Sequence, residues 1–230
     1  MTTTARLLCF WMMFAGTHIG LSSLVVRRPL IKRMGLRGFK AAYTLVALAT
    51  FIPLMVAYFG DKHAGAVLFA PEPDLRLLAE ALMLVAIVTL AQGLATRSPI
   101  GTPAELRPSA YIGPRGVQRI TRHPRNLAFG TFGVAHCLVN PTAGDWIFFG
   151  GFTLFALVSA WHQDARMRSE AREGVGEYLK ETSYWPFAAV LGGRQRIAIG
   201  EFRPVALIVS IVVYSALRYF HPRLFGGDWG

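Results

Sequence analysis

The chain has 230 residues, of which 53% are hydrophobic and only 16% charged, and its formal net charge is +11. This balance is too apolar for an ordinary soluble domain. Long apolar runs interrupt the basic residues, so they do not form the continuous basic face of a nucleic-acid-binding protein, and that class is excluded. The composition predicts an all-α integral membrane protein.

Six apolar runs follow one another along the chain. A helix of about 20 apolar residues crosses the hydrocarbon core of a bilayer, so the runs predict a polytopic helical bundle with about six transmembrane helices. A soluble bundle is disfavoured because no run has the polar face of an amphipathic surface helix. We expect a single domain over residues 1–230, with spans at 6–26, 41–60, 76–95, 124–140, 146–162 and 203–219.

The positive charges indicate how these helices cross the membrane. Nineteen of the 24 Lys and Arg residues fall in the connections after the first, third and fifth runs. Such connections face the cytoplasm under the positive-inside rule. We therefore expect both termini on the non-cytoplasmic side of a bacterial inner membrane. Membrane lipid is the expected surrounding, and another membrane protein is a further expected partner.

Two connecting segments have a composition of their own. Residues 163–187 mix both charge signs at helical spacing and end in Tyr178, Tyr184 and Trp185, side chains that favour a membrane interface. This pattern predicts a cytoplasmic surface helix beside the membrane. Residues 99–114 are rich in Pro and Gly, which predicts an ordered loop or surface segment.

Ionisable side chains inside the spans are functional-site candidates because burying them is costly. His18 lies in the first span, His136 in the fourth and Glu80 near the outer start of the third, while His162 ends the fifth. A lone buried histidine is usually satisfied by polar neighbours, but two on facing helices can hold a haem iron. Counted from the span ends, the depths of His18 and His136 differ by about 6 Å. The pair predicts a haem with these two residues as its metal ligands, and His162 as an alternative.

The start of the fourth run, TRHPRN, is a second candidate site. His123 precedes His136 by about 20 Å and about 220° on one helix, so the two cannot bind one iron. Pro124 favours a helix start here. Arg122, His123 and Arg125 would then bind an anionic group, such as a haem propionate or a cofactor carboxylate. A basic membrane anchor is the structural alternative.

These motifs resemble those of a known family. The sequence resembles the NnrU family, which includes plant zeta-carotene cis-trans isomerases, in three places. The first two are THIGLSSLVVR and GLRGFKAAYTLVALAT. The third is TRHP, whose histidine is followed thirteen residues later by the histidine of GVAHCLVN. The resemblance implies a haem b protein with axial ligands at His18 and His136. It also implies a cysteine three residues before the second ligand, where this chain has Gly133 and carries Cys137 instead. The implied function is linked to denitrification and nitric oxide metabolism, or to a redox-dependent isomerisation.

A second resemblance implies a different function. The RHP motif, a helical hairpin and the tail EAREGVGEYLKETSYWPF are similar to the isoprenylcysteine-type membrane methyltransferases. That similarity implies S-adenosylmethionine bound by Arg122, His123, Tyr178 and Glu181. A third hypothesis is a non-catalytic membrane accessory protein, in which the histidines of the spans are satisfied core residues.

Overall fold

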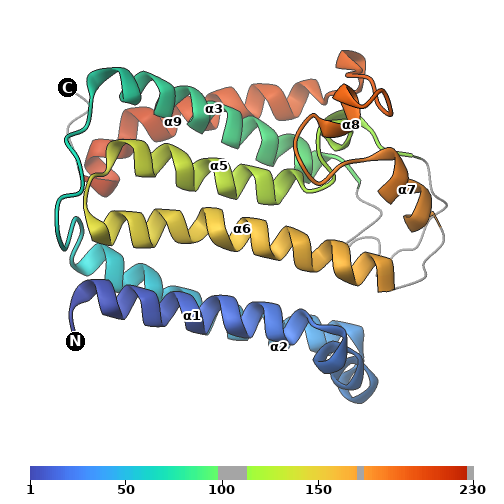
Figure 1. Ribbon diagram of the computed structural model, residues 1–230, viewed down its shortest axis with the longest axis horizontal. Coiled ribbons are helices and arrows are strands. Elements are labelled where there is room, and N and C mark those ends of the chain that lie inside the picture. The colour runs from blue at the N-terminus through green and yellow to red at the C-terminus, as the bar shows by residue number, and fades with distance from the viewer. Residues whose placement is uncertain (98–112, 170–173, 227–230) are drawn as a thin grey trace. The chain divides into compact units, whose positions relative to one another are not determined.

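The computed structural model describes residues 1–97, 113–169 and 174–226, and every regular element in these ranges is a helix. The all-α prediction is confirmed. Most of the predicted Pro/Gly-rich segment 99–114 lies outside the described residues. The helices, labelled in Figure 1, are α1 (Thr3–Ser22), α2 (Leu24–Gly60), α3 (Pro73–Ala95), η1 (Gly116–Arg119), α5 (Pro124–Val139), α6 (Ala143–Ser169), α7 (Val175–Glu181), α8 (Ala188–Leu191), η2 (Ile199–Glu201) and α9 (Pro204–Phe225).

Among the described residues, four helices are long and apolar enough to cross a membrane: α2, α3, α6 and α9. The prediction of a membrane helical bundle is confirmed. Five of the six predicted spans fall on a single helix or end within one residue of it, whereas the first, 6–26, runs past the end of α1 into the start of α2. A count of six is not confirmed. The 16 residues of α5 rise about 24 Å, less than the roughly 30 Å of a hydrocarbon core.

Gly35 divides α2 into two parts. Its φ of 73° and ψ of 166° are non-helical, and only glycine adopts such a φ without a steric penalty. The part before it, residues 24–34, includes basic residues of the predicted first cytoplasmic connection, so this part of the connection is helical. Residues 36–60 form the apolar part of α2.

The chain forms two compact units. Met1–Ala79 and Gly133–Arg166 form the first, which holds α1, α2, the end of α5 and most of α6. Glu80–Phe132 and Met167–Gly230 form the second, which holds most of α3, the start of α5 and α7 to α9. The single domain that the sequence predicts stays a prediction.

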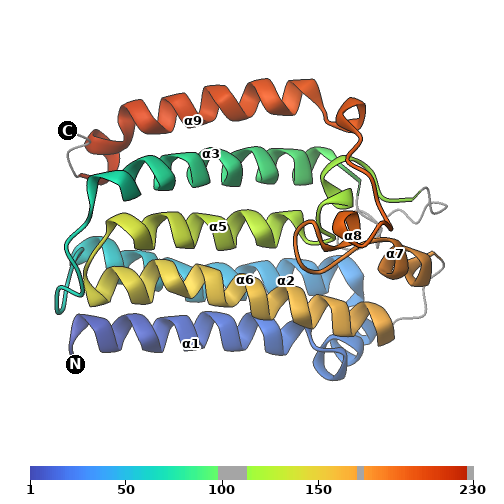
Figure 2. The ribbon, with the colours of Figure 1, turned by 45° about the horizontal axis from the view of Figure 1, so that its top comes forward.

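Aromatic side chains form the core of the first unit, where α1, α2 and α6 lie side by side (Figures 1 and 2). The Trp11 ring meets Phe152 edge-on, with centroids 5.0 Å apart. Phe14 lies 5.1 Å from Phe51 and 5.0 Å from Phe155, measured between ring centroids. Such tilted and edge-on pairs are favourable beyond the apolar area that they bury, so they fix the three helices against one another.

In the second unit, α3 and α9 run side by side (Figure 2). The Gln92 amide donates to the carbonyl of Arg203 and accepts from its N–H, both at 2.9 Å. These bonds satisfy a backbone donor and acceptor where α9 begins. Near the other ends of the two helices, Arg218 pairs with Glu80 at 3.1 Å. The Glu80 carboxylate that the sequence singles out thus has a partner of opposite charge.

Candidate functional site

His18 lies in an aromatic pocket of the first unit. Its ring centroid is 4.7 Å from that of Tyr43, 5.3 Å from Phe14 and 5.2 Å from Phe155. The Tyr43 hydroxyl donates to the His18 backbone carbonyl at 3.2 Å. The Nδ1 atom of His18 is buried and has no hydrogen-bond partner among the described residues. Since an unpaired buried polar atom is costly, this nitrogen is open to a bound water or ligand.

His136 lies in a different environment of the same unit. Its half-buried ring stacks on Phe149, with centroids 4.4 Å apart and an interplanar angle of 21°. The Asn140 amide donates to the backbone carbonyl of His136 at 2.8 Å. The Asn140 side chain therefore bonds the backbone of His136.

The two histidines contact different phenylalanines of α6. Phe149, beside His136, and Phe155, beside His18, are six residues apart, which is about 9 Å of rise and about 120° of rotation. Two axial ligands of one iron would need imidazoles that face each other across a single haem plane. Haem b binding stays a prediction of the sequence.

A long apolar groove runs beside α6 in the first unit, with a volume of about 940 Å³. It extends from Trp146 to Val158, about 18 Å along the helix. Its walls are aliphatic, aromatic and glycine residues, with Cys137 and Thr153 as small polar side chains. The groove is lined by Leu8, Trp11, Met12, Ala15, Ile19, Phe69, Leu75, Val134, Cys137, Leu138, Trp146, Ile147, Gly150, Gly151, Thr153, Leu154, Phe155 and Val158.

Two glycines of α6 shape this groove. A Cβ on Gly151 would overlap the indole ring of Trp11, so the absence of a side chain lets Trp11 pack directly on the helix backbone. A Cβ on Gly150 would lie 3.8 Å from the Cys137 sulfur, an ordinary contact distance. Gly150 therefore leaves open space over Cys137. The sequence analysis identified neither glycine, because the residues around a glycine in an apolar run do not show which distant side chain will pack against it.

The basic start of α5 is packed inside the second unit. Arg122 is 8% exposed and His123 is 4% exposed. The Arg122 guanidinium donates to the Thr182 carbonyl at 2.9 Å, and its backbone N–H donates to the Ser183 carbonyl at 3.0 Å. The His123 ring lies edge-on to Tyr184 at 5.7 Å. These two predicted anion ligands hold the segment that follows α7, so the arrangement has a structural role.

Arg125 is separate from those contacts. It is half-buried, and its Cγ lies 3.6 Å from where a Cβ on Gly93 would be. Pro124 comes closer still, at 3.1 Å from the same point. Gly93 therefore lets the start of α5 approach α3. Anion binding by Arg122, His123 and Arg125 together stays a prediction.

A buried carboxylate that the sequence did not single out lies at the start of α6. Asp145 is 0% exposed. It accepts bonds from the Tyr58 hydroxyl at 2.8 Å, the Thr142 hydroxyl at 2.7 Å and the Thr142 N–H at 3.2 Å, and its other contact is His63 Nδ1 at 3.0 Å. The Asp145 N–H bonds the Thr142 hydroxyl in return. The sequence signal that could have identified Asp145 is a T-x-x-D capping box, Thr142 to Asp145, before an apolar run.

The second unit contains a polar cavity of about 470 Å³. Glu201 there accepts two bonds from the Arg119 guanidinium, both at 2.7 Å, and one from the Gly116 N–H at 2.8 Å. The Arg119 guanidinium also donates to Gln195. The bonds from Arg119 lower the pKa of Glu201 to about 2, with help from the Gly116 N–H. The pair is therefore ionised at neutral pH and neutralises its own charge.

Comparison with known proteins identifies the family. The model of the family described as NnrU protein matches residues 6–228. The chain belongs to the NnrU family. The chloroplastic 15-cis-zeta-carotene isomerases of Zea mays and Arabidopsis thaliana are both 25% identical to it, over 222 and 225 residues. The alignments cover 95% of this chain and 60% of each isomerase, so the chain spans about 60% of the length of these relatives. No solved structure gives a significant match.

One departure of this chain from the NnrU pattern has a structural cause. The resemblance implies a cysteine at the position of Gly133. A Cβ there would lie only 2.5 Å from the Phe149 carbonyl oxygen and 2.5 Å from Thr153 Oγ1. Here α5 and α6 pack so closely that a cysteine does not fit without movement of backbone. Cys137 lies one turn further along α5 and lines the apolar groove instead.

The second resemblance is not supported. Neither the NnrU match nor the two isomerases point to a membrane methyltransferase. Tyr178, which that resemblance places in a cofactor pocket, is 0% exposed. Its hydroxyl reaches the Arg122 carbonyl at 3.5 Å. In this NnrU protein the tyrosine is therefore part of the packing between α7 and the start of α5.

Proposed function

We propose that this protein is an isomerase-like membrane protein whose apolar groove binds an elongated apolar substrate of the polyene class. The groove is the observation that supports this. Its volume of about 940 Å³ lies at the upper end of the roughly 300–1,000 Å³ of ligand pockets. Both curated relatives are named as isomerases of 15-cis-zeta-carotene, which is a long hydrocarbon.

The lining explains how such a substrate would be recognised. A hydrocarbon polyene offers no hydrogen-bonding group, so it binds through shape and burial of apolar surface. The Trp11 and Phe155 rings provide flat walls, and Gly150 leaves the space over Cys137 open. In this role the chain binds and orients the substrate and excludes water from it.

A binding and turnover experiment tests this proposal. The full chain in lipid vesicles is incubated with 15-cis-zeta-carotene, and the bound polyene per protein and the isomers formed are measured by absorption and chromatography. Gly150→Leu fills the groove and should lower polyene binding at least tenfold. Gly16→Leu is the matched control, since Gly16 is on α1, is exposed and has nothing within 4 Å of a Cβ. Equal polyene binding by both variants would overturn the proposal.

The same assay separates the proposal from a non-catalytic accessory role. An accessory protein would bind polyene weakly and without dependence on the groove, and would form no new isomer. If the wild type binds polyene and Gly150→Leu does not, but no isomer appears in either, the chain is a carrier and not an isomerase.

Haem b is kept as a separate hypothesis from the sequence. The buried, unpaired Nδ1 of His18 supports a ligand at that residue, whereas the placement of His136 against Phe149 does not. Absorption spectra of purified protein test it. Soret and α bands that weaken in His18→Ala and His136→Ala would support the predicted pair. Their absence from the wild type would end the haem hypothesis, and with it the link to nitric oxide chemistry.

The orientation in the membrane is also a proposal. The positive-inside pattern predicts both termini on the non-cytoplasmic side of a bacterial inner membrane, whereas the two plant relatives are chloroplastic. Single cysteines at Thr2 and Asp61 should react with an impermeant thiol reagent added to intact cells. A cysteine at Arg33 should not react.

A further inference from the structure

A short segment of the second unit exposes large apolar side chains. The segment comprises residues 185–199 and includes α8, and we name it the α8 segment. Leu191 is 86% exposed, Ile199 82% and Trp185 62%, and Phe187 and Ile197 are also exposed. Single exposed apolar residues are ordinary, but five within fifteen residues form a patch that calls for a partner.

These side chains are exposed although the backbone beneath them is held in place. The Phe187 N–H donates to the Ile120 carbonyl at 2.8 Å. The Ser183 hydroxyl donates to the Trp185 carbonyl and accepts from the Ala189 N–H, both at 2.9 Å. Ala189 is 0% exposed. The small residue therefore faces the interior while the large ones point away from it.

The backbone conformation of Phe187 is a second observation on this segment. Its φ of 64° lies in the left-handed region, which is unfavourable for a residue with a bulky side chain. Such a conformation persists only where surrounding contacts enforce it. Here it begins α8 and leaves the aromatic ring 44% exposed.

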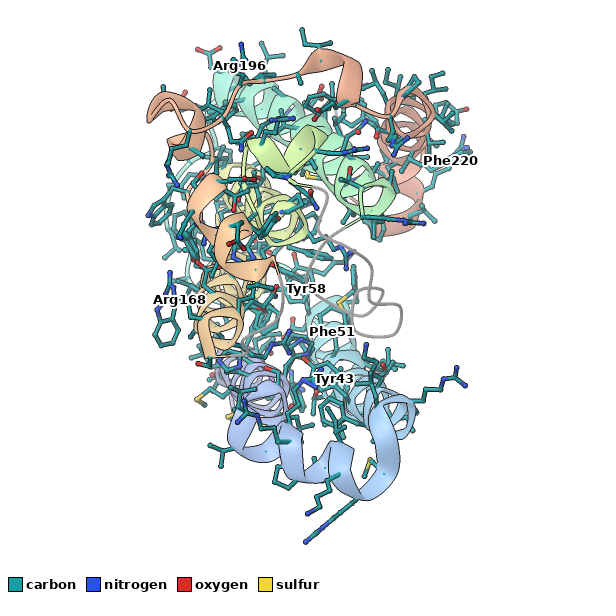
Figure 3. All side chains as sticks on the ribbon, turned by 90° about the vertical axis from the view of Figure 1, so that its right-hand side faces the viewer. Tyr43, Phe51, Tyr58, Arg168, Arg196 and Phe220 are labelled. Carbon is teal, nitrogen blue, oxygen red and sulfur yellow. The ribbon has the colours of Figure 1, made fainter. Side chains whose placement is uncertain are left out.

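Two arginines, Arg194 and Arg196, belong to the α8 segment. The Arg194 guanidinium donates to the carbonyls of Lys180 and Thr182, and the exposed Arg196, labelled in Figure 3, lies within the segment. Of the nearby acids, Glu201 is neutralised by Arg119, and Glu181 lines the polar cavity together with Arg194. Exposed positive charges beside apolar side chains match a surface of negative headgroups over an apolar layer.

The continuation of the chain places this patch beside a membrane. Ile199 is followed after five residues by Pro204, where α9 begins. α9 is long and apolar enough to cross a membrane, and only Ser210 of its residues is buried. Of the sequence-predicted interfacial residues in 163–187, Tyr178 is fully buried and Trp185 is exposed, so the exposed patch begins where that predicted segment ends.

We infer that the α8 segment lies on the membrane surface next to α9 and binds the headgroups of anionic phospholipids. The exposed apolar side chains insert at the level of the lipid glycerol backbone; they are those of Trp185, Phe187, Leu191 and Ile199. The Arg196 guanidinium binds a lipid phosphate. Each arginine at such a surface favours anionic over zwitterionic lipid by roughly fivefold.

Quenching of tryptophan fluorescence by brominated lipids tests the inference. The full chain and Trp185→Phe are placed in vesicles that contain brominated phosphatidylcholine or brominated phosphatidylglycerol at equal mole fractions. The difference between the two proteins reports Trp185. We expect its quenching to be stronger with bromine near the headgroup end of the acyl chain than near its tip. We also expect phosphatidylglycerol to quench it several-fold more effectively than phosphatidylcholine.

Two charge variants identify the source of the lipid preference. Arg196→Gln should lower the preference for phosphatidylglycerol about fivefold. Arg223→Gln, which changes an exposed arginine near the other end of α9, should leave that preference unchanged. If Trp185→Phe does not fold, Ile199→Trp adds a reporter on the same patch. Unquenched Trp185 would mean that water or a protein covers the segment and would overturn the inference, as would equal quenching by the two lipids.

Discussion

The Tyr58 hydroxyl at the end of α2 donates a 2.8 Å hydrogen bond to the Asp145 carboxylate at the start of α6, across 87 positions of sequence. Asp145 also caps α6 through Thr142. One buried carboxylate thus joins two helices and satisfies a helix terminus. The Tyr58 ring stacks on Phe148 at 3.9 Å, so the joint is both polar and aromatic.

Asp145→Ala should destabilise the protein by about 3 kcal/mol, because it leaves several buried donors without their charged acceptor. Tyr58→Phe removes one bond to the carboxylate and should cost about 2 kcal/mol. Denaturation of the detergent-solubilised protein, followed by circular dichroism, measures both. The double variant should cost less than the sum, and full additivity would contradict direct coupling of the two residues.

Gly133→Ala should destabilise the first unit by about 1–3 kcal/mol, because its new methyl group meets the Phe149 carbonyl and Thr153. Gly150→Ala on α6 is the matched control. Its Cβ has an ordinary 3.8 Å contact with Cys137, so the better helix propensity of alanine should make it neutral or more stable by up to about 1 kcal/mol. Thermal unfolding of the two variants in parallel checks the difference, and equal midpoints would disprove close packing at Gly133.

The Arg119 and Glu201 pair should make stability depend on acid pH. The pKa of Glu201 is lowered to about 2 in the folded protein, below its usual value of 4.5. The stabilisation is therefore complete above the unfolded pKa and is lost as pH falls through the folded one. Between pH 4.5 and 2, the thermal midpoint of the wild type should fall more steeply than that of Glu201→Gln. Parallel curves would show that the pair does not contribute.

Arg122→Gln should loosen the segment after α7, because the guanidinium no longer donates to the Thr182 carbonyl. A lost bond of about 1.5 kcal/mol raises local opening roughly tenfold. Limited digestion with trypsin, followed by mass spectrometry, should therefore show faster cleavage after Arg194 and Arg196. Arg125→Gln is the control and should leave the cleavage rate unchanged. A similar rate in both variants would argue against a structural role for Arg122.

The helices follow from local pattern, which is why the sequence located them. An apolar run must satisfy its backbone groups internally when it leaves water, so each of the six runs becomes a helix. The helical conformation of the basic connection before Gly35 could not be predicted from the sequence, because charged residues are compatible with both a helix and a loop. Its helical conformation depends on a glycine that ends one part of α2 and starts the next.

The site was predicted less completely, because its residues meet only through packing. The sequence identified His18 and His136 as buried imidazoles and estimated their depths, but which side of α6 each one faces depends on how three helices turn toward one another. The apolar groove could not be predicted, because its lining residues come from several helices and meet only through packing.

The sequence by itself determined that this is a helical membrane protein of the NnrU pattern, because hydrophobicity, charge asymmetry and motif spacing are properties of the chain in order. The tertiary structure decided which residues share an environment. It placed Arg122 and His123 in the packing of the second unit, set His18 against Phe155 and His136 against Phe149 of α6, and brought Tyr58 to Asp145. Contacts between distant segments depend on the shapes of both partners, and one segment alone does not contain that information.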